Sequence, residues 1–88
     1  MKIQIRKYGD LLVSRPAGRE AVAAMLAYLP DVGGDEPVEL DFEGVHVVAP
    51  SWLDEVLTGL RARFGDRVRC LPTGNASLTK SLEAIGGG

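Results

Sequence analysis

Apolar and polar residues alternate in the first segment of the chain, and a second apolar segment follows closely. Ile3 and Ile5 alternate with polar neighbours over residues 2–6, and residues 11–14 form the second, shorter run. A period of two is expected of strands that bury one face. Gly9 and Asp10 mark a turn between the runs. Because this link is so short, we expect the two strands to pair as an antiparallel hairpin.

A helical pattern follows the second run. Pro16 favours the first turn of a helix, and Val22, Met25 and Leu29 recur at helical spacing after it. The next segment, residues 31–37, combines glycines with acidic residues. We therefore expect an exposed and mobile loop between this helix and the next strand.

The middle of the chain changes from a strand pattern to a helix pattern. Val38, Leu40 and Phe42 alternate with acidic residues, and residues 45–48 form another extended run. From residue 52 onward, the apolar residues recur at the spacing of an amphipathic helix. The residues of this stripe are Trp52, Leu53, Val56, Leu57, Leu60 and Phe64.

Ser51 lies at this junction, immediately before the helix pattern. Its hydroxyl is placed to accept a hydrogen bond from a free amide of the first turn, as an N-cap does. Asp54, three residues later, adds negative charge near the positive end of the helix dipole. The last predicted elements are a strand at residues 68–71 and a short helix with the apolar stripe Leu78, Leu82 and Ile85.

Together these patterns predict a single α/β domain over residues 1–85 with the element order β-β-α-β-α-β-α. We expect a mixed sheet of about four strands, the later ones parallel, with the helices mainly on one face. Lys2, Gln4 and Arg6 are suitable exposed positions for the other face, which polar side chains or a partner would cover. The three glycines of residues 86–88 are expected to form a flexible tail.

One long segment carries a resemblance to a known family. The sequence LDFEGVHVVAPSWLDEVLTGL, with GDLLVSRPAGREAV before it and RVRCLPTGN after it, resembles the STAS superfamily of sulfate transporters and anti-sigma factor antagonists. It is most similar to the small STAS-like bacterial domains of unassigned function. The resemblance implies a non-catalytic regulatory domain for protein-protein interaction and signalling. It also implies a partner of the histidine-kinase-like ATPase or serine kinase type, in a partner-switching system.

The resemblance places Ser51 where regulatory STAS domains carry a phosphorylated serine. Their loop reads Asp-Ser-Ser-Gly, whereas this chain has Ala49, Pro50, Ser51 and Trp52. The resemblance implies that the loop aspartate is needed for recognition by the kinase, and Ala49 replaces it here. The serine-aromatic pair at the helix start is similar to the STAS-like relatives and favours them over an antagonist. Two interpretations of Ser51 remain open, a helix N-cap and a phosphoacceptor or contact residue. The candidate partner contacts around it are Ala49, Pro50, Trp52, Asp54 and Glu55.

Composition narrows the classes of function. The chain has 88 residues, which is enough for one domain with one small core. Its formal net charge of -2 gives no general reason to expect binding to nucleic acid or to an anionic membrane. Its start lacks the apolar core of a signal peptide, and its apolar runs are too short to span a bilayer, so we expect a cytoplasmic protein. The single cysteine, Cys70, agrees with a reducing compartment and is expected to be buried in its strand.

Candidate chemistry is sparse, and we expect no enzyme, cofactor or metal. A catalytic triad would need Ser51, the only histidine His46, and Asp41 or Asp54, without a Gly-x-Ser-x-Gly turn. One histidine and one cysteine are too few for a closed zinc site within one chain. The segment GNASLTKS has a threonine where a phosphate loop needs glycine before lysine. We expect Asn75 or Ser77 to cap the final helix instead.

Two alternatives to a signalling domain remain. One is a structural or oligomerisation module, with Trp52 as a surface anchor in a homo-oligomer. The other is a small hydrolase that uses Ser51. A basic cluster after the second helix pattern is either a solvated helix end or a surface for an acidic partner. Its residues are Arg61, Arg63, Arg67 and Arg69.

Overall fold

The computed structural model describes residues 1–29 and 36–85 of the chain. Most of the loop predicted at residues 31–37, and the whole glycine tail of residues 86–88, lie outside the described residues. Within them the elements in chain order are β1 (Lys2–Gln4), a 3-10 turn η1 (Ile5–Tyr8), β2 (Leu11–Leu12), α1 (Arg15–Tyr28), β3 (Val38–Asp41), β4 (Val47–Val48), α2 (Pro50–Phe64), η2 (Gly65–Arg67), β5 (Val68–Cys70) and α3 (Ala76–Ala84).

The strands of the described residues form two small parallel sheets. One has three strands in the order β1-β3-β5 and the other pairs β2 with β4. The predicted antiparallel hairpin is therefore wrong, because β1 and β2 each pair with a later segment. The expectation of one mixed sheet of about four strands is also not met, since within residues 1–29 and 36–85 five strands form two sheets and every pair is parallel.

The two ladders are successive parts of the same pairing of two chain segments. Lys2 pairs with Glu39 and Leu11 with Val47, so the partner lies 37 positions further along the chain in the first ladder and 36 in the second. Between the ladders, η1 and Gly9, which has φ of 124°, carry the chain onward without reversing it. The turn signal at Gly9 therefore marks an interruption of one strand path.

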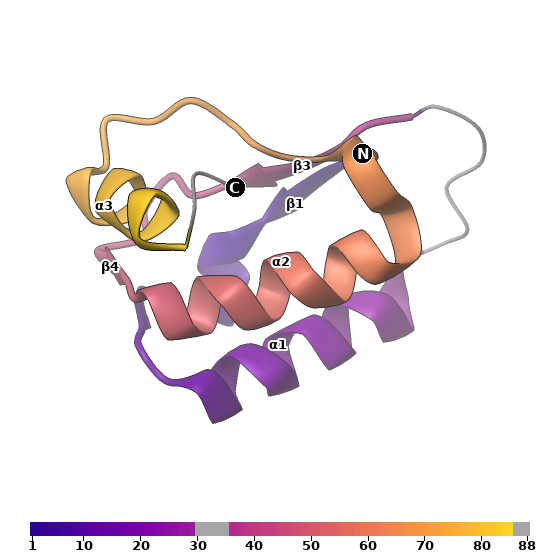
Figure 1. Ribbon diagram of the computed structural model, residues 1–88, viewed down its shortest axis with the longest axis horizontal. Coiled ribbons are helices and arrows are strands. Elements are labelled where there is room, and N and C mark those ends of the chain that lie inside the picture. The colour runs from indigo at the N-terminus through magenta and orange to yellow at the C-terminus, as the bar shows by residue number, and fades with distance from the viewer. Residues whose placement is uncertain (30–35, 86–88) are drawn as a thin grey trace.

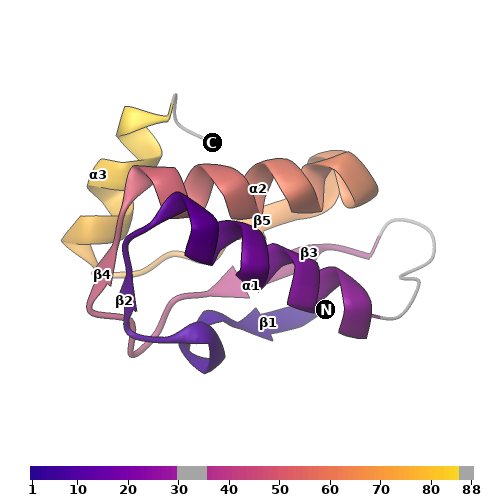
Figure 2. The ribbon, with the colours of Figure 1, turned by 90° about the horizontal axis from the view of Figure 1, so that it is seen from below.

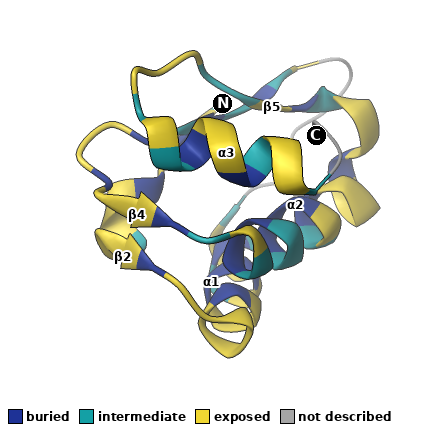
Figure 3. Cartoon of the chain, turned by 60° about the vertical axis from the view of Figure 1, so that its left-hand side comes forward, coloured by how far each residue is buried: buried dark blue, intermediate teal, exposed yellow. Residues whose placement is uncertain are grey.

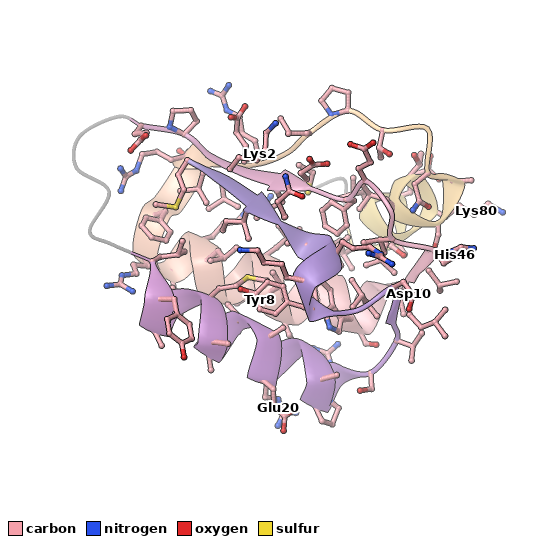
Figure 4. All side chains as sticks on the ribbon, turned by 180° about the vertical axis from the view of Figure 1, so that it is seen from behind. Lys2, Tyr8, Asp10, Glu20, His46 and Lys80 are labelled. Atoms are coloured by element: carbon pink, nitrogen blue, oxygen red, sulfur yellow. The ribbon has the colours of Figure 1, made fainter. Side chains whose placement is uncertain are left out.

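Helices α1 and α2 lie side by side and cover one face of the three-stranded sheet (Figures 1 and 2). Seen from behind, β1 lies in front of α2, and α1 lies below it (Figure 4), which agrees with the expected helices on one face. Ile3 and Leu40 are buried beneath the helices, whereas Lys2 and Gln4 are exposed as predicted. Arg6 is also exposed but belongs to η1.

Two glycines allow the helices to approach closely. A Cβ on Gly18 of α1 would lie 2.8 Å from the Trp52 carbonyl oxygen, and one on Gly59 of α2 would lie 2.6 Å from Val22 Cγ2. Real Cβ atoms almost never come this close to another heavy atom. Trp52 itself is only 1% exposed. The expectation that Trp52 anchors an oligomer at the surface is therefore wrong, because its ring belongs to the core between the helices and strands.

Helix α3 lies beside β4 (Figure 3), and its serine hydroxyl groups close the outer edge of that strand. Ser77 Oγ accepts a hydrogen bond from the Val48 amide at 3.0 Å and donates to the Val48 carbonyl at 3.2 Å. Ser81 Oγ also donates to the Val48 carbonyl. These hydroxyls satisfy backbone groups that a neighbouring strand would otherwise pair.

The predicted cap of the last helix is confirmed at Asn75. Its Oδ1 accepts from the amides of Ser77 at 2.9 Å and Leu78 at 3.2 Å, while its Nδ2 donates to the Val45 carbonyl at 2.7 Å. The segment GNASLTKS therefore has a structural role in capping α3 and attaching it to the loop before β4.

Candidate functional site

The amino-terminal ends of α1 and α2 lie next to each other (Figures 1 and 2). Strand β2 leads into α1 and strand β4 leads into α2, and the two strands are parallel neighbours. Parallel strands end at the same edge of a sheet, so both helices start from the same side of the molecule. We call this region, formed by residues 10–15 and 46–55, the Ser51 end.

Ser51 is not the N-cap of α2, so that prediction is wrong. The helix begins one residue earlier at Pro50, with Ala49 as an N-cap that makes no side-chain bond. Ala49 donates its amide to the Leu12 carbonyl at 2.7 Å, which continues the β4 pairing up to the helix start. The Ser51 hydroxyl instead donates to the Val13 carbonyl at 3.4 Å and is half-buried.

The serine that caps a helix at this end is Ser14. Its Oγ accepts from the Ala17 amide at 3.2 Å at the start of α1. The sequence contains this signal, since Ser14 stands just before Pro16 and the first apolar stripe, but the extended pattern of residues 11–14 assigned Ser14 to the preceding strand.

Arg15 joins the two helix starts. Its Nη1 lies 3.1 Å from Asp54 Oδ2 and 3.0 Å from Glu55 Oε1, while Arg19 Nε lies 3.5 Å from the same Glu55 oxygen. The hydrogen bonds that the Arg15 guanidinium donates, to Glu55 first and to Asp54 second, raise its pKa. The two acidic candidate contact residues therefore already have cationic partners within the chain, a pairing that the sequence analysis missed.

An exposed apolar surface borders Ser51. Leu11 is 63% exposed, Val13 55% and Val47 39%. Leu11 and Val47 are partners in the β2–β4 ladder, and Val13 lies two residues after Leu11, so the three share the outer face of this ladder. We call these three residues the apolar strip. Because Val13 also receives the Ser51 hydrogen bond, the strip reaches Ser51 directly, beside the exposed Pro50.

The residues of the considered triad have other partners. The Ser51 hydroxyl donates to Val13, Asp54 pairs with Arg15, and Asp41 Oδ1 accepts from the Glu43 amide at 3.0 Å. His46 is exposed in the loop before β4. Within residues 1–29 and 36–85, no group of three or more His, Cys, Asp or Glu side chains is arranged to hold a metal.

A hollow of about 440 Å³ lies between the loop after β3 and the loop after β5. Two of its polar lining residues have structural hydrogen bonds, since Asn75 caps α3 and Thr73 Oγ1 accepts from the Asn75 amide at 3.2 Å. Cys70, in β5, is partly buried, and this burial raises the pKa of its thiol, while Arg61 nearby lowers it. No described helix is both long and apolar enough to cross a membrane.

Comparison with protein families identifies the fold. The family model described as a STAS-like domain of unknown function (DUF4325) matches residues 26–73. The chain belongs to this family. The STAS-like resemblance is thereby confirmed, and the matched segment extends from the last part of α1 past the end of β5 and includes Ser51. No curated protein and no solved structure matches the chain.

The basic cluster of this STAS-like domain is partly structural. Arg63 Nη1 donates to the Leu26 carbonyl at 2.8 Å, and Arg67 Nε donates to the Phe64 carbonyl at 3.2 Å. Both guanidinium groups also lie within 6 Å of the Phe64 ring centroid, at 5.7 and 5.5 Å. These contacts tie the end of α2 to its surroundings.

Proposed function

We propose that this STAS-like domain is a non-catalytic protein-interaction module that binds a partner at its Ser51 end. The observation that carries the proposal is the apolar strip, three large side chains exposed together beside Ser51. Exposed apolar side chains that are contiguous, and not scattered singly, are typical of binding surfaces. The polar edge formed by Arg15, Asp54 and Glu55 would form the rim of such an interface.

From the resemblance to regulatory STAS domains, we further propose a partner of the histidine-kinase-like ATPase or serine kinase type, in a cytoplasmic partner-switching system. Modification of Ser51 would act on this same surface. Once phosphorylated, Ser51 Oγ carries no hydrogen and cannot donate to the Val13 carbonyl, and the negative charge of the phosphate would repel that oxygen. Two negative charges would also arise beside the apolar strip, near Asp54 and Glu55, and weaken docking of an apolar partner surface.

The docking proposal is tested by placing charge within the strip. Val13→Asp and Val47→Asp are expected to abolish recovery of the partner from cells of the native host, measured by affinity capture and quantitative mass spectrometry. Tyr28→Asp is the matched control, because Tyr28 is also a large exposed side chain, 86% exposed, but lies at the other end of α1. Equal recovery with all three variants would refute a docking role for the strip.

The regulatory part of the proposal is tested at Ser51. Ser51→Asp is expected to weaken partner capture, whereas Thr58→Asp adds the same charge on an exposed position of α2 and leaves it unchanged. Incubation with the captured partner and ATP, followed by phosphosite mapping, shows whether Ser51 is modified. If Ser51 stays unmodified and Ser51→Asp binds normally, the domain docks without this switch.

The oligomerisation alternative rests on the same apolar strip, since a second copy would also cover it. Light scattering coupled to gel filtration separates the two. A dimer that Val13→Asp converts to a monomer, without any captured heterologous partner, would favour self-association.

A further inference from the structure

A groove of about 270 Å³ lies beside the apolar strip, between β2 and α1. Its buried lining residues are Leu12, Ala21 and Trp52, and its more exposed rim includes Leu11 and Glu20. Figure 4 shows this side of the molecule, with Tyr8 between η1 and α1 and Glu20 on the outer side of the helix. Small-molecule pockets usually enclose about 300–1,000 Å³. The groove is below that range and suits a single large side chain.

The groove and the apolar strip are continuous. Leu11 belongs to both, because it is a member of the strip and also lines the groove. A partner that covers the strip therefore also meets the opening of the groove. A side chain that enters such a pocket at an interface is the kind of anchor that contributes most to binding.

The charge at the rim of the groove indicates which kind of residue lies next to the apolar anchor in the partner. Glu20 is the only charged residue that lines it, and within the described residues its carboxylate has no ion pair or hydrogen bond. The neighbouring Arg19 pairs with Glu55 instead. A cation on the partner would meet an unpaired carboxylate at the rim of an apolar cavity, whereas an acidic group would be repelled.

We infer that the partner of the Ser51 end inserts one apolar side chain into this groove and places a lysine or arginine against Glu20. The inference rests on the proposed docking function and specifies the chemistry of the docking segment. The occupant is a protein segment with a large apolar residue next to a basic one. Trp52, which failed as a surface anchor of this chain, here forms part of the buried lining that receives the partner's anchor.

A random 12-residue peptide library displayed on phage, selected against the full chain, tests this chemistry. We expect enriched peptides to carry a large apolar residue within a few positions of lysine or arginine. No enrichment, or enrichment without that pair of residues, would overturn the inference.

Variants of the groove test the site. Ala24→Phe fills the groove from α1 and is expected to weaken an enriched peptide by about tenfold or more. Ala23→Phe makes the same change at the adjacent, exposed position, which does not line the groove, and should leave binding unchanged. Ala17→Leu narrows the groove from an exposed position of α1 and should also weaken the peptide. A loss of binding in this variant too would show that the effect of Ala24→Phe is not a folding defect. Equal binding by Ala23→Phe and Ala24→Phe would place the peptide elsewhere.

Charge reversal tests the role of Glu20. Glu20→Lys is expected to weaken the enriched peptide and to favour a version in which its basic residue is replaced by glutamate. Glu83→Lys changes the net charge equally on exposed α3 and should do neither.

The failure of this inference can be distinguished from failure of the docking proposal. Loss of the natural partner with Val13→Asp but not with Ala24→Phe would retain the strip and reject the groove. Retention of that partner by both variants would reject both.

Discussion

The two parallel ladders have opposite chemistry on their outer faces, although the same two stretches of chain build both. Both inner faces are buried, with Leu40 in the first ladder and Leu12 in the second. Polar side chains on an outer face form hydrogen bonds with water, whereas exposure of apolar side chains to water is unfavourable. The difference indicates that the inner faces determine the fold, while the second outer face is available for a partner. The outer residues are Lys2, Gln4, Glu39 and Asp41 in the first ladder, and Leu11 and Val47 in the second.

The largest expected effect tests whether the inner faces are equivalent. Leu40→Ala and Leu12→Ala each remove a buried side chain and should lower the free energy of unfolding by about 2–5 kcal/mol. Gln4→Ala, on the outer face, should change it by less than about 0.5 kcal/mol. Urea denaturation followed by circular dichroism measures all three. If Leu12→Ala were as mild as Gln4→Ala, the second ladder would not belong to the core.

A smaller effect tests what closes the edge of the second ladder. Ser77→Ala leaves the Val48 amide without its hydroxyl partner and should cost about 1–3 kcal/mol. Hydrogen exchange of the Val48 amide should accelerate, while that of Glu39 in the first ladder changes less. Thr79→Ala is the control, because the Thr79 hydroxyl donates to the carbonyl of Asn75, the N-cap of its own helix, and not to β4. Equal exchange at Val48 in both variants would contradict closure of the edge by Ser77.

Alkaline pH probes the inner side of β5 in the first sheet. Burial raises the pKa of the Cys70 thiol above its ordinary value of 9.0, so the folded state holds this proton more tightly than the unfolded state. The contribution to stability is fully present below pH 9.0 and is lost as the pH rises through the folded pKa. Denaturation from pH 7 to 10 should show a steeper loss for the wild type than for Cys70→Ala. Parallel curves would contradict the burial effect.

The smallest effect on stability is expected on the apolar outer face itself. Val47→Thr keeps the branched Cβ and should change the free energy of unfolding by less than about 0.5 kcal/mol. Partner capture should nevertheless fall. Val48→Thr places the same hydroxyl on the buried side of β4 and should be clearly more destabilising. Similar denaturation curves for the two variants would contradict the claim that one face of β4 is buried in the core and the other is exposed.

Local patterns in the sequence predicted the helices and the buried positions well. The apolar stripes placed α1 and α2 within one or two residues of their observed bounds, because helical spacing is a property of neighbouring residues. Asn75 likewise predicted the start of α3, since a capping side chain accepts hydrogen bonds from the amides that follow it in the sequence. The family was found from the same central segment.

Strand pairing and the polar contacts of the candidate site could not be predicted in this way. Gly9 has the appearance of a hairpin turn, but the partner of β2 lies 36 positions away, and nothing local encodes that choice. The link from Arg15 to Asp54 spans 39 residues and depends on the same parallel arrangement. The apolar strip was also missed, because β2 and β4 have two residues each, too few for a periodic pattern.

The closure of β4 by α3 has a consequence for synthesis on the ribosome. Translation makes the strands and the two long helices before it reaches Ser77 and Ser81, so the Val48 edge remains unpaired until the last helix emerges. An open strand edge is a template for pairing with other chains. Helix α3 therefore protects this sheet against aggregation only after it has been synthesised. A nascent chain stalled before residue 77 would expose both the apolar strip and an open edge of the same sheet.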